Sequence, residues 1–287
     1  MSPRHPADVP TETPTRKTET LMGKRLPVLL LLLAVPLAAP ASVAAQKQGD
    51  QTRLVFTMSA GYAFGRDLWA VGSQPVFLGG LDLYSLQRDL RGTWTAELGA
   101  TYFRTPGLGF TFDLTFIDIA TEDSCTLLSN SGSIDNAATC ASIDAAATSA
   151  LSTAISAGIL LRAASRQAVS PYLRVQGGIL LVSRSTTEVT GNYINADLEP
   201  VYVPIYPTEG SSSVSAQLAL GAGVTIPISK AYHARIEGRA TTFGLPVVTG
   251  PTDFQGILPP TETKYMTQFS ILVGIDLVLE KKHGRRY

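Results

Sequence analysis

The residue types that could carry acid–base chemistry are concentrated in one short stretch of the sequence. His233 and Glu237 are four residues apart, and Arg235 and Arg239 share their every-other-residue spacing. On a β-strand this spacing puts all four side chains on one face, where a carboxylate could orient a histidine that acts as a general base. The same residues can also form a ladder of buried ion pairs, and we favour this structural interpretation.

Other signatures of catalysis are missing from the sequence. There is no Gly-x-Ser-x-Gly nucleophile turn, and His5, His233 and His283 do not provide a histidine paired with serine or aspartate. Gly221-Ala222-Gly223 lies inside a predicted strand with no helix after it, so it does not match a phosphate-binding loop. We therefore predict that the chain is not an enzyme and that it uses no cofactor.

The two cysteines, Cys125 and Cys140, lie in one polar segment rich in alanine, serine and aspartate. In an exported chain, an isolated pair of this kind predicts a disulfide that stabilises its own loop. A zinc site is disfavoured because no histidine is near and two sulfur ligands do not complete its coordination. The acidic loop residues Glu122, Asp123 and Asp135 are scattered as solvated side chains are, so we predict no bound metal.

The N-terminal segment has the order of a secretory signal peptide. Basic residues precede the apolar run Leu26–Ala39, and the small residues Val43 and Ala45 precede Gln46. This order predicts cleavage after Ala45, with translation starting at Met1 or Met22, and it predicts an exported chain. Removal of residues 1–45 leaves 18 basic and 20 acidic residues of the 23 of each, so nucleic acid is not an expected partner.

From Arg53 onward, the sequence consists of runs in which every second residue is apolar. In the first run, for example, Phe56 and Met58 alternate with Thr57 and Ser59. Period-two runs close to the roughly 9–11 residues of a tilted transmembrane strand predict strands of a membrane barrel. Eight runs are present, at about 53–64, 94–102, 110–116, 151–162, 173–181, 214–226, 232–240 and 268–280.

The connections between these runs are alternately long and short. The short ones are the Pro106-Gly107 turn, residues 163–169 and the Ser229-Lys230 turn. Long connections at one end and short ones at the other indicate an up-and-down antiparallel β-barrel with its long loops outside the cell. Because Val76–Asp89 in the first gap is also strand-like, either a hairpin beyond the membrane or a count of ten strands is expected. The four long gaps span about 65–92, 121–147, 188–212 and 247–264.

Charged side chains identify the face that lines the lumen. A charge facing lipid costs about 2–4 kcal/mol at the bilayer midplane, so the charged face of the strands must point inward. Four acidic and four basic residues favour a lumen plugged by ion pairs over a water-filled one. The predicted lumen network consists of Glu97, Asp113, Arg162, Arg174, Arg235, Glu237, Arg239 and Asp276.

Aromatic residues on the apolar face mark the two predicted membrane interfaces. Such girdles separate a membrane barrel from a soluble one, in which the apolar face would be the core. Tyr62, Trp94 and Tyr265 mark the interface near the long loops, and Tyr102, Phe110 and Tyr232 the other.

Nearly all of Arg53–Glu280 resembles the small outer-membrane β-barrel domains of the OmpA/OmpX kind. The resemblance implies an outer-membrane barrel over residues 46–287, outer-membrane lipid around it, and recognition by the barrel-assembly machinery through an aromatic residue at the end of the last strand. The chain departs from that pattern, because its last strand ends at Leu279-Glu280 and Tyr287 follows seven residues later.

These observations predict a structural or surface-interaction barrel that presents its loops to an extracellular ligand of unknown kind. Two alternatives stay open. The first is a small pore or channel for ions and small solutes, in which the same charges line water. The second is a soluble secreted β-barrel binding module, in which the apolar face encloses a cavity.

Overall fold

The structure is a computed structural model that describes residues 53–163, 169–208, 210, 212–229 and 231–280. The predicted signal peptide, residues 1–45, and the C-terminal segment Lys281–Tyr287 lie outside the described residues.

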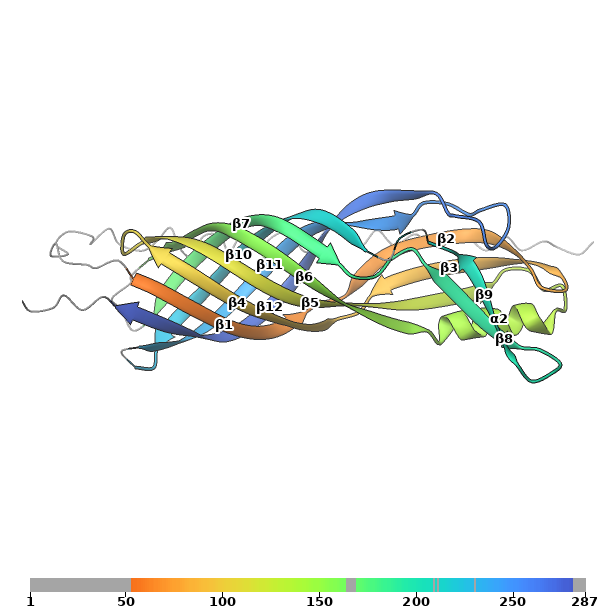
Figure 1. Cartoon of the computed structure of the whole chain (residues 1–287), viewed down its shortest axis with the longest axis horizontal. Coiled ribbons are helices and arrows are strands. Elements are labelled where there is room, and N and C mark those ends of the chain that lie inside the picture. Colours follow the sequence, from red (N-terminus) through yellow and green to blue (C-terminus); the bar gives the residue numbers. More distant parts are fainter. Residues whose placement is uncertain (1–52, 164–168, 209, 211, 230, 281–287) are drawn as a thin grey trace, which may run out of the picture. The chain divides into compact units, whose positions relative to one another are not determined.

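Eight strands form the wall of a closed antiparallel barrel (Figure 1). Each pairs with the ring strands that precede and follow it, and β12 pairs with β1 from Arg53↔Glu280 to Ala63↔Ser270, which closes the ring. The predicted up-and-down barrel of eight strands is therefore confirmed. The ring strands are β1 (Arg53–Ala63), β4 (Thr93–Phe103), β5 (Leu108–Leu127), β6 (Ala147–Arg162), β7 (Ser170–Val182), β10 (Ser213–Pro227), β11 (Tyr232–Val248) and β12 (Thr261–Glu280).

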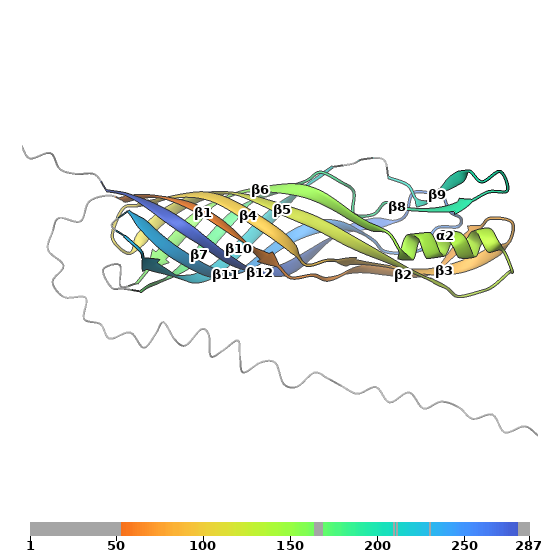
Figure 2. The ribbon, with the colours of Figure 1, turned by 90° about the horizontal axis from the view of Figure 1, so that it is seen from below.

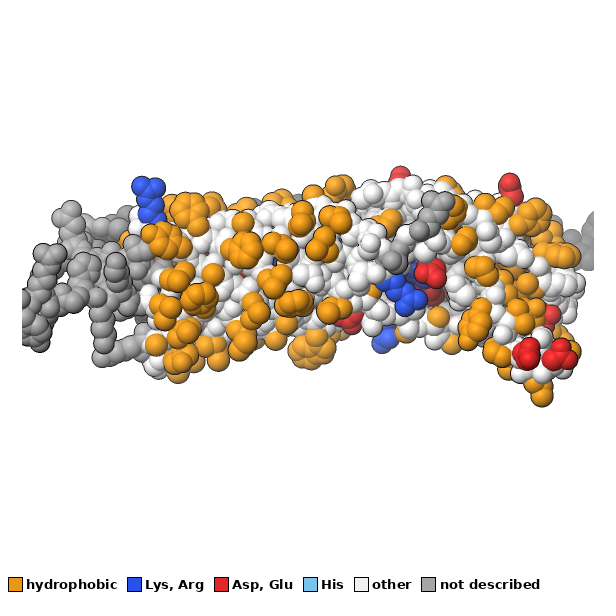
Figure 3. Space-filling model, viewed as in Figure 1, with side chains coloured by type: hydrophobic (Ala, Val, Ile, Leu, Met, Phe, Trp, Pro, Cys, Tyr) orange, Lys and Arg blue, Asp and Glu red, His pale blue; other side chains and the backbone are white. Residues whose placement is uncertain are grey.

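The exterior of the ring is apolar and its interior is polar. On β1, Phe56 and Met58 are exposed, whereas Thr57 and Ser59 are buried. Hydrophobic side chains are spread over the barrel wall in Figure 3 with few charges among them. Because lipid selects an apolar exterior, this is the fold of an outer-membrane β-barrel. The aromatic residues of the predicted girdles all have exposed side chains: Tyr62, Trp94, Tyr102, Phe110, Tyr232 and Tyr265.

The polarity of the two faces reverses partway along the longest strands. On β5 the buried, inward-facing side chain is charged at Asp113 and apolar at Ile117, and the charged side chain of Asp118 lies on the outward face. On β11 the buried residues change from Arg239 to Phe243. Strands β5 and β12, each 20 residues long, thus extend beyond the predicted runs. Past the reversal they leave the lipid and enclose an apolar core of their own.

Two further strands, β2 (Arg66–Phe77) and β3 (Leu81–Leu90), form a hairpin within the first predicted gap. β3 pairs with the end of β5, so ten strands share one sheet while the ring keeps eight. The strand-like stretch Val76–Asp89 is therefore the two sides of a turn and not a ring strand. Gly79 in this turn has a φ of +76°, which favours glycine.

The second predicted gap contains an α-helix that the sequence did not lead us to expect. α2 (Ile134–Asp144) is capped at its N-terminus by Ser133, whose hydroxyl accepts a hydrogen bond from the Asn136 N–H at 3.3 Å. Its buried residues are Asn136, Thr139, Cys140 and Ile143, which have the spacing of one helix face. No helix in the described part of the chain is long and apolar enough to span a bilayer.

The third predicted gap contains a separate two-stranded hairpin, β8 (Val189–Ile194) and β9 (Pro200–Tyr206). The Asn195 N–H donates to Glu199 O at 3.0 Å. Because hydrogen-bonded and non-hydrogen-bonded pairs alternate between antiparallel strands, the next pair, Ile194↔Pro200, makes no backbone hydrogen bonds between the two strands. In such a pair the backbone nitrogen points away from the partner strand, so the nitrogen of Pro200, which has no hydrogen to donate, lies at the outer edge of β9 and hinders pairing with a further strand there.

The elements beyond the ring make up one structure, which we call the cap: β2, β3, α2, β8, β9 and the ends of β5, β11 and β12. In both ribbon views the cap lies at the end of the barrel that carries the long connections (Figures 1 and 2). We call this the loop end and the opposite end the turn end. The cap and the adjoining barrel mouth share an apolar core whose buried members include Leu68, Val76, Tyr84, Leu86, Ile143, Val203, Ile205, Tyr206, Phe243, Leu245 and Val247.

Candidate functional site

Seven of the eight charged residues predicted for the lumen are buried and joined in one network of contacts. Each is at most 7% exposed. Arg162, the eighth, is half-buried at the turn end, where its guanidinium lies 4.1 Å from the centre of the Phe103 ring and donates to the Pro106 carbonyl. The seven are Glu97, Asp113, Arg174, Arg235, Glu237, Arg239 and Asp276.

Arg174 of β7 is the centre of this network. Its Nη1 lies 2.8 Å from Asp113 Oδ2 and 3.2 Å from Glu97 Oε1, and its Nη2 lies 2.6 Å from Glu237 Oε1. One guanidinium thus contacts three carboxylates from β4, β5 and β11. Gln176 and Thr111 also donate hydrogen bonds to Asp113.

Two more arginines link Glu237 to Glu97 and to Asp276. Arg239 Nε lies 2.8 Å from Glu237 Oε1, and Arg239 Nη1 pairs with Glu97. Arg235 pairs with Glu237 through Nη2 and lies 3.8 Å from Asp276 through Nη1. The hydroxyl of Tyr172 donates to Glu237 at 2.7 Å and accepts from Arg235 Nε at 2.7 Å. Opposite charges at these distances stabilise each other strongly where water is excluded.

Apolar layers lie on both sides of the network. Toward the turn end, buried Val55, Phe103, Leu160 and Val278 pack together with Tyr172. Toward the loop end, the inward residues of the barrel mouth continue into the core of the cap. Buried apolar side chains therefore border the network on both sides, an arrangement typical of the narrow interior of eight strands.

The cavities that border the network have the size of single water molecules. One, of about 20 Å³, lies toward the cap and is lined by Gln217 and Arg239 among others. Gln217 Oε1 and Arg239 Nη2 are buried without a hydrogen-bond partner among the described residues, and this space can hold one water between them.

The cavity on the other side of the network, also about 20 Å³, contains the histidine considered for acid–base chemistry. His233 lies beside Asp276 in the β11–β12 register, and both line this cavity with Arg235. The hydroxyl groups of the lining belong to threonine side chains and Tyr172, and the lining contains no serine. A cavity of this volume is too small for a substrate. Among the described residues, no three His, Cys, Asp or Glu side chains are grouped to hold a metal ion.

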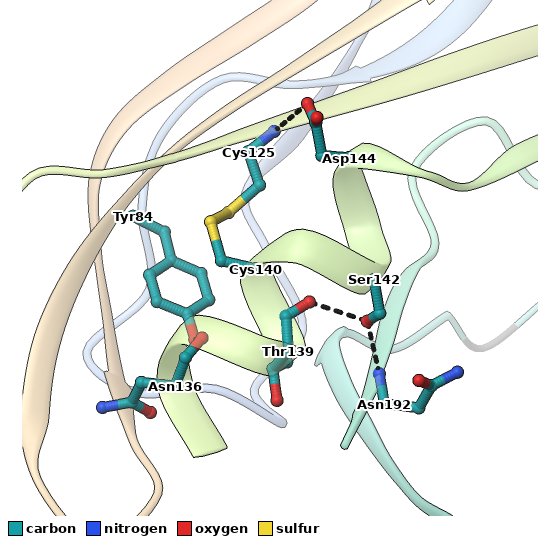
Figure 4. The surroundings of a disulfide bond; sticks show 8 residues. All are labelled: Tyr84, Cys125, Asn136, Thr139, Cys140, Ser142, Asp144 and Asn192. Atoms are coloured by element: carbon teal, nitrogen blue, oxygen red, sulfur yellow. Dashed lines mark hydrogen bonds between the residues drawn. A yellow bond between two sulfur atoms is a disulfide. The ribbon is translucent and has the colours of Figure 1, made fainter. Parts of the chain in front are cut away.

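The cap is stabilised by a disulfide between Cys125 and Cys140, which the sequence predicts. The bond joins the end of β5 to α2, and Asp144 of the helix accepts from the Cys125 N–H at 3.4 Å (Figure 4). Closing a loop of this size contributes about 3 kcal/mol through the entropy of the unfolded chain.

Three buried polar residues that sequence reasoning missed link the segments of the cap. Gln74 of β2 accepts from the Tyr206 hydroxyl at 2.8 Å and from the Thr252 N–H at 2.8 Å. Arg88 of β3 pairs with Asp123 of β5, with Nη2 at 2.6 Å from Oδ2. Asp123 is 6% exposed, so the prediction that it is a solvated loop residue is wrong. The same guanidinium donates to the carbonyls of residues 186 and 188, and it lies 5.4 Å from the centre of the Trp69 ring.

The third of these residues, Asp82, holds the start of α2. Its carboxylate accepts from the Ser131 hydroxyl at 2.6 Å, the Ser131 N–H at 2.7 Å and Asn136 Nδ2 at 2.7 Å. Tyr84, two residues along β3, donates its hydroxyl to the Asn136 carbonyl at 2.6 Å, and burial raises the pKa of this phenol. The hydrogen bond from the Ser131 side chain lowers the pKa of Asp82, with further lowering by Asn136.

We expect Asp82→Asn to lower the stability of the cap at neutral pH. The variant should also lack the loss of stability that the wild-type cap shows as the pH falls. Because the folded pKa lies below the unfolded value, the carboxylate stabilises the cap above about pH 4 and stops doing so as the pH falls through the folded pKa. Urea titrations followed by Trp69 fluorescence, in a Trp94→Phe background, measure this. Asp253→Asn, at an exposed loop position, is the matched control; equal pH profiles for the two variants would contradict the prediction.

The chain is similar in structure to solved β-barrels. No protein-family model and no curated protein matches it. Neisserial surface protein A is 12% identical, with 79% of this chain and 99% of that one covered and a TM-score of 0.36. Outer membrane protein AlkL is 12% identical, with 84% and 96% covered and a TM-score of 0.39.

The outer membrane protease OmpT from Escherichia coli also matches, at 8% identity, with 82% of this chain and 100% of that one covered and a TM-score of 0.36. These likenesses concern the fold alone, and the fold is that of an outer-membrane β-barrel, as the resemblance in the sequence predicts. They do not test for enzymatic activity, so its absence stays a prediction.

Proposed function

We propose that the chain is an outer-membrane anchor with a plugged lumen that presents its cap outside the cell as an interaction surface. The observation that carries this proposal is the filling of the interior. An ion-pair network with two cavities of about 20 Å³ lies between two apolar layers. A barrel filled in this way is suited to anchoring, so the cap is the part that can act on a partner.

The position of the first and last residues of the ring supports an external cap. The first and last ring residues, Arg53 and Glu280, pair at the turn end. In the outer-membrane barrels that the sequence resembles, both chain ends face the periplasm. The same orientation here puts the short turns in the periplasm and the long connections outside.

The tip of the β8–β9 hairpin has the features of a recognition element. Leu198 is 84% exposed and has a φ of +62°, which is uncommon for a residue with a side chain. The Asn195 side chain fixes this turn by accepting from the N–H groups of Asp197 at 3.0 Å and Glu199 at 2.9 Å. A rigid turn that presents an apolar anchor between two carboxylates favours a protein partner with an apolar pocket and a basic rim.

Two observations disfavour the alternative functions. A channel for ions or small solutes needs a continuous water-filled path, whereas the buried arginines and carboxylates here contact one another. A soluble binding module needs a polar exterior, whereas large apolar side chains such as Phe112, Leu220 and Ile271 are exposed around the ring.

Thiol labelling in intact cells tests the orientation of the cap. The only two native cysteines form the disulfide, so an introduced cysteine is the sole reactive thiol. We expect a membrane-impermeant maleimide to label Leu198→Cys in intact cells and Ser229→Cys, at the turn end, only after the outer membrane is opened. The reverse pattern would overturn the proposal.

A further inference from the structure

The wall of the barrel has a seam between β2 and β12 at the loop end. β1 pairs with β12 only as far as Ser270, and the chain then enters β2, which pairs with β3 instead. One more backbone bond, from Phe64 N–H to Phe269 O at 2.8 Å, extends the pairing. Beyond it, two cationic side chains bridge the seam: Arg66 Nη1 donates to Thr267 O at 2.6 Å, and Lys264 Nζ donates to Leu68 O at 3.2 Å.

A notch with a volume of about 360 Å³ opens on the outer surface at this seam. Phe64 and Phe269 line it on the barrel side, and their side chains are 47% and 57% exposed. Phe64 continues the aromatic girdle, because its ring lies 5.6 Å from that of Tyr62, which lies 6.0 Å from Trp94. The notch is therefore at the height where lipid chains meet their headgroups.

Arg66 gives this notch its chemical character. It is exposed and follows Phe64 by two residues, so its guanidinium lies just beyond the aromatic girdle. The bond to Thr267 O holds one nitrogen of the guanidinium in place, and this reduces the entropy that is lost when a ligand binds the group. Guanidinium groups bind phosphate through paired, charge-assisted hydrogen bonds.

We propose that this notch is a binding site for the phosphate headgroup of an anionic membrane lipid. Arg66 binds the phosphate, while Phe64 and Phe269 contact the upper part of the acyl chains. Asp67 also lines the notch, and its carboxylate opposes an anionic ligand. Two substitutions in the site should therefore have opposite effects on lipid binding: Asp67→Asn should tighten it, whereas Arg66→Gln should weaken it.

Lipid-quenching of Trp94 fluorescence tests the proposal on the full chain in vesicles. A Trp69→Phe background leaves Trp94 as the only tryptophan. Vesicles contain phosphatidylcholine with an equal fraction of brominated phosphatidylglycerol or brominated phosphatidylcholine. We expect phosphatidylglycerol to be enriched over phosphatidylcholine about fivefold next to Trp94. This ratio corresponds to about 1 kcal/mol, the contribution of one arginine near a membrane surface.

Arg184→Gln is the matched control, because Arg184 is an exposed arginine at the same end that does not line the notch. The preference should persist in this control, disappear in Arg66→Gln and increase in Asp67→Asn. A wild-type chain with no preference, or an Arg66→Gln variant that keeps it, would overturn the lipid site. The site rests on the membrane-embedded barrel of the proposed function, so flotation is measured in parallel. A chain that did not float with vesicles would overturn both proposals, whereas a floating chain without preference would overturn the lipid site alone.

Discussion

Arg174→Met is expected to lower the free energy of unfolding by about 3–5 kcal/mol, the usual cost of removing one partner from a buried ion pair. Arg174 contacts Glu97, Asp113 and Glu237, and each of these carboxylates is about 1% exposed. Methionine fills much of the same volume, so the loss reports on charge more than on packing. The measurement is urea-induced unfolding of the protein in lipid vesicles.

The matched control for this prediction is Arg91→Met. Arg91 lies 3.6 Å from Glu122, and both side chains are more than half exposed. An exposed pair of this kind contributes at most about 1 kcal/mol. Equal effects of the two substitutions would mean that Arg174 is hydrated, and the plug would then be wrong.

Three further results depend on the same plug. Adding Asp113→Asn to Arg174→Met should recover part of the lost stability, because Asp113 forms an ion pair with Arg174 and with no other described residue of the network. Arg235→Ala with Arg239→Ala should also destabilise the barrel by a few kcal/mol, since both contact Glu237. In planar bilayers the wild-type protein should give no large stable conductance steps.

The ring and its polar interior could be predicted because each depends on a local pattern. Period-two alternation assigns a face to every residue of a strand, so Glu97 and Arg174 could be placed inside before their partners were known. The contacts themselves join β4 and β7, which are far apart in the sequence. Alternation carries no information on which charges meet, and this had to come from the structure.

The cap could not be predicted because its determinants are hidden or non-local. The buried face of α2 begins with Asn136 and Thr139, so its helical spacing does not look apolar, although Ser133 and the alanines nearby are a readable helix signal. Gln74, Asp82 and Arg88 act by contacting distant segments, and single polar residues in a strand give no sign of this. Loop length alone therefore predicts four long loops, whereas the structure has one folded cap.

The reversal of polarity along the strands was present in the sequence and gives the sharpest test of the membrane boundary. Val273 of β12 is exposed and pairs with Ala60 of β1 and Ile236 of β11, in the apolar belt. Thr263 is exposed on the same strand, and its position lies past the reversal. The even spacing of ten residues puts the two side chains on the same face.

We expect Val273→Arg to lower the free energy of unfolding in lipid vesicles by about 2–4 kcal/mol and Thr263→Arg by no more than about 1 kcal/mol. The reason is that only the first substitution forces a guanidinium into hydrocarbon. Both sites face outward on one strand, so strand propensity and lost side-chain packing affect them similarly. In a soluble barrel both arginines would reach water, and the difference between the variants would vanish. A difference below about 1 kcal/mol would therefore contradict the membrane orientation on which the anchor and the lipid site both depend.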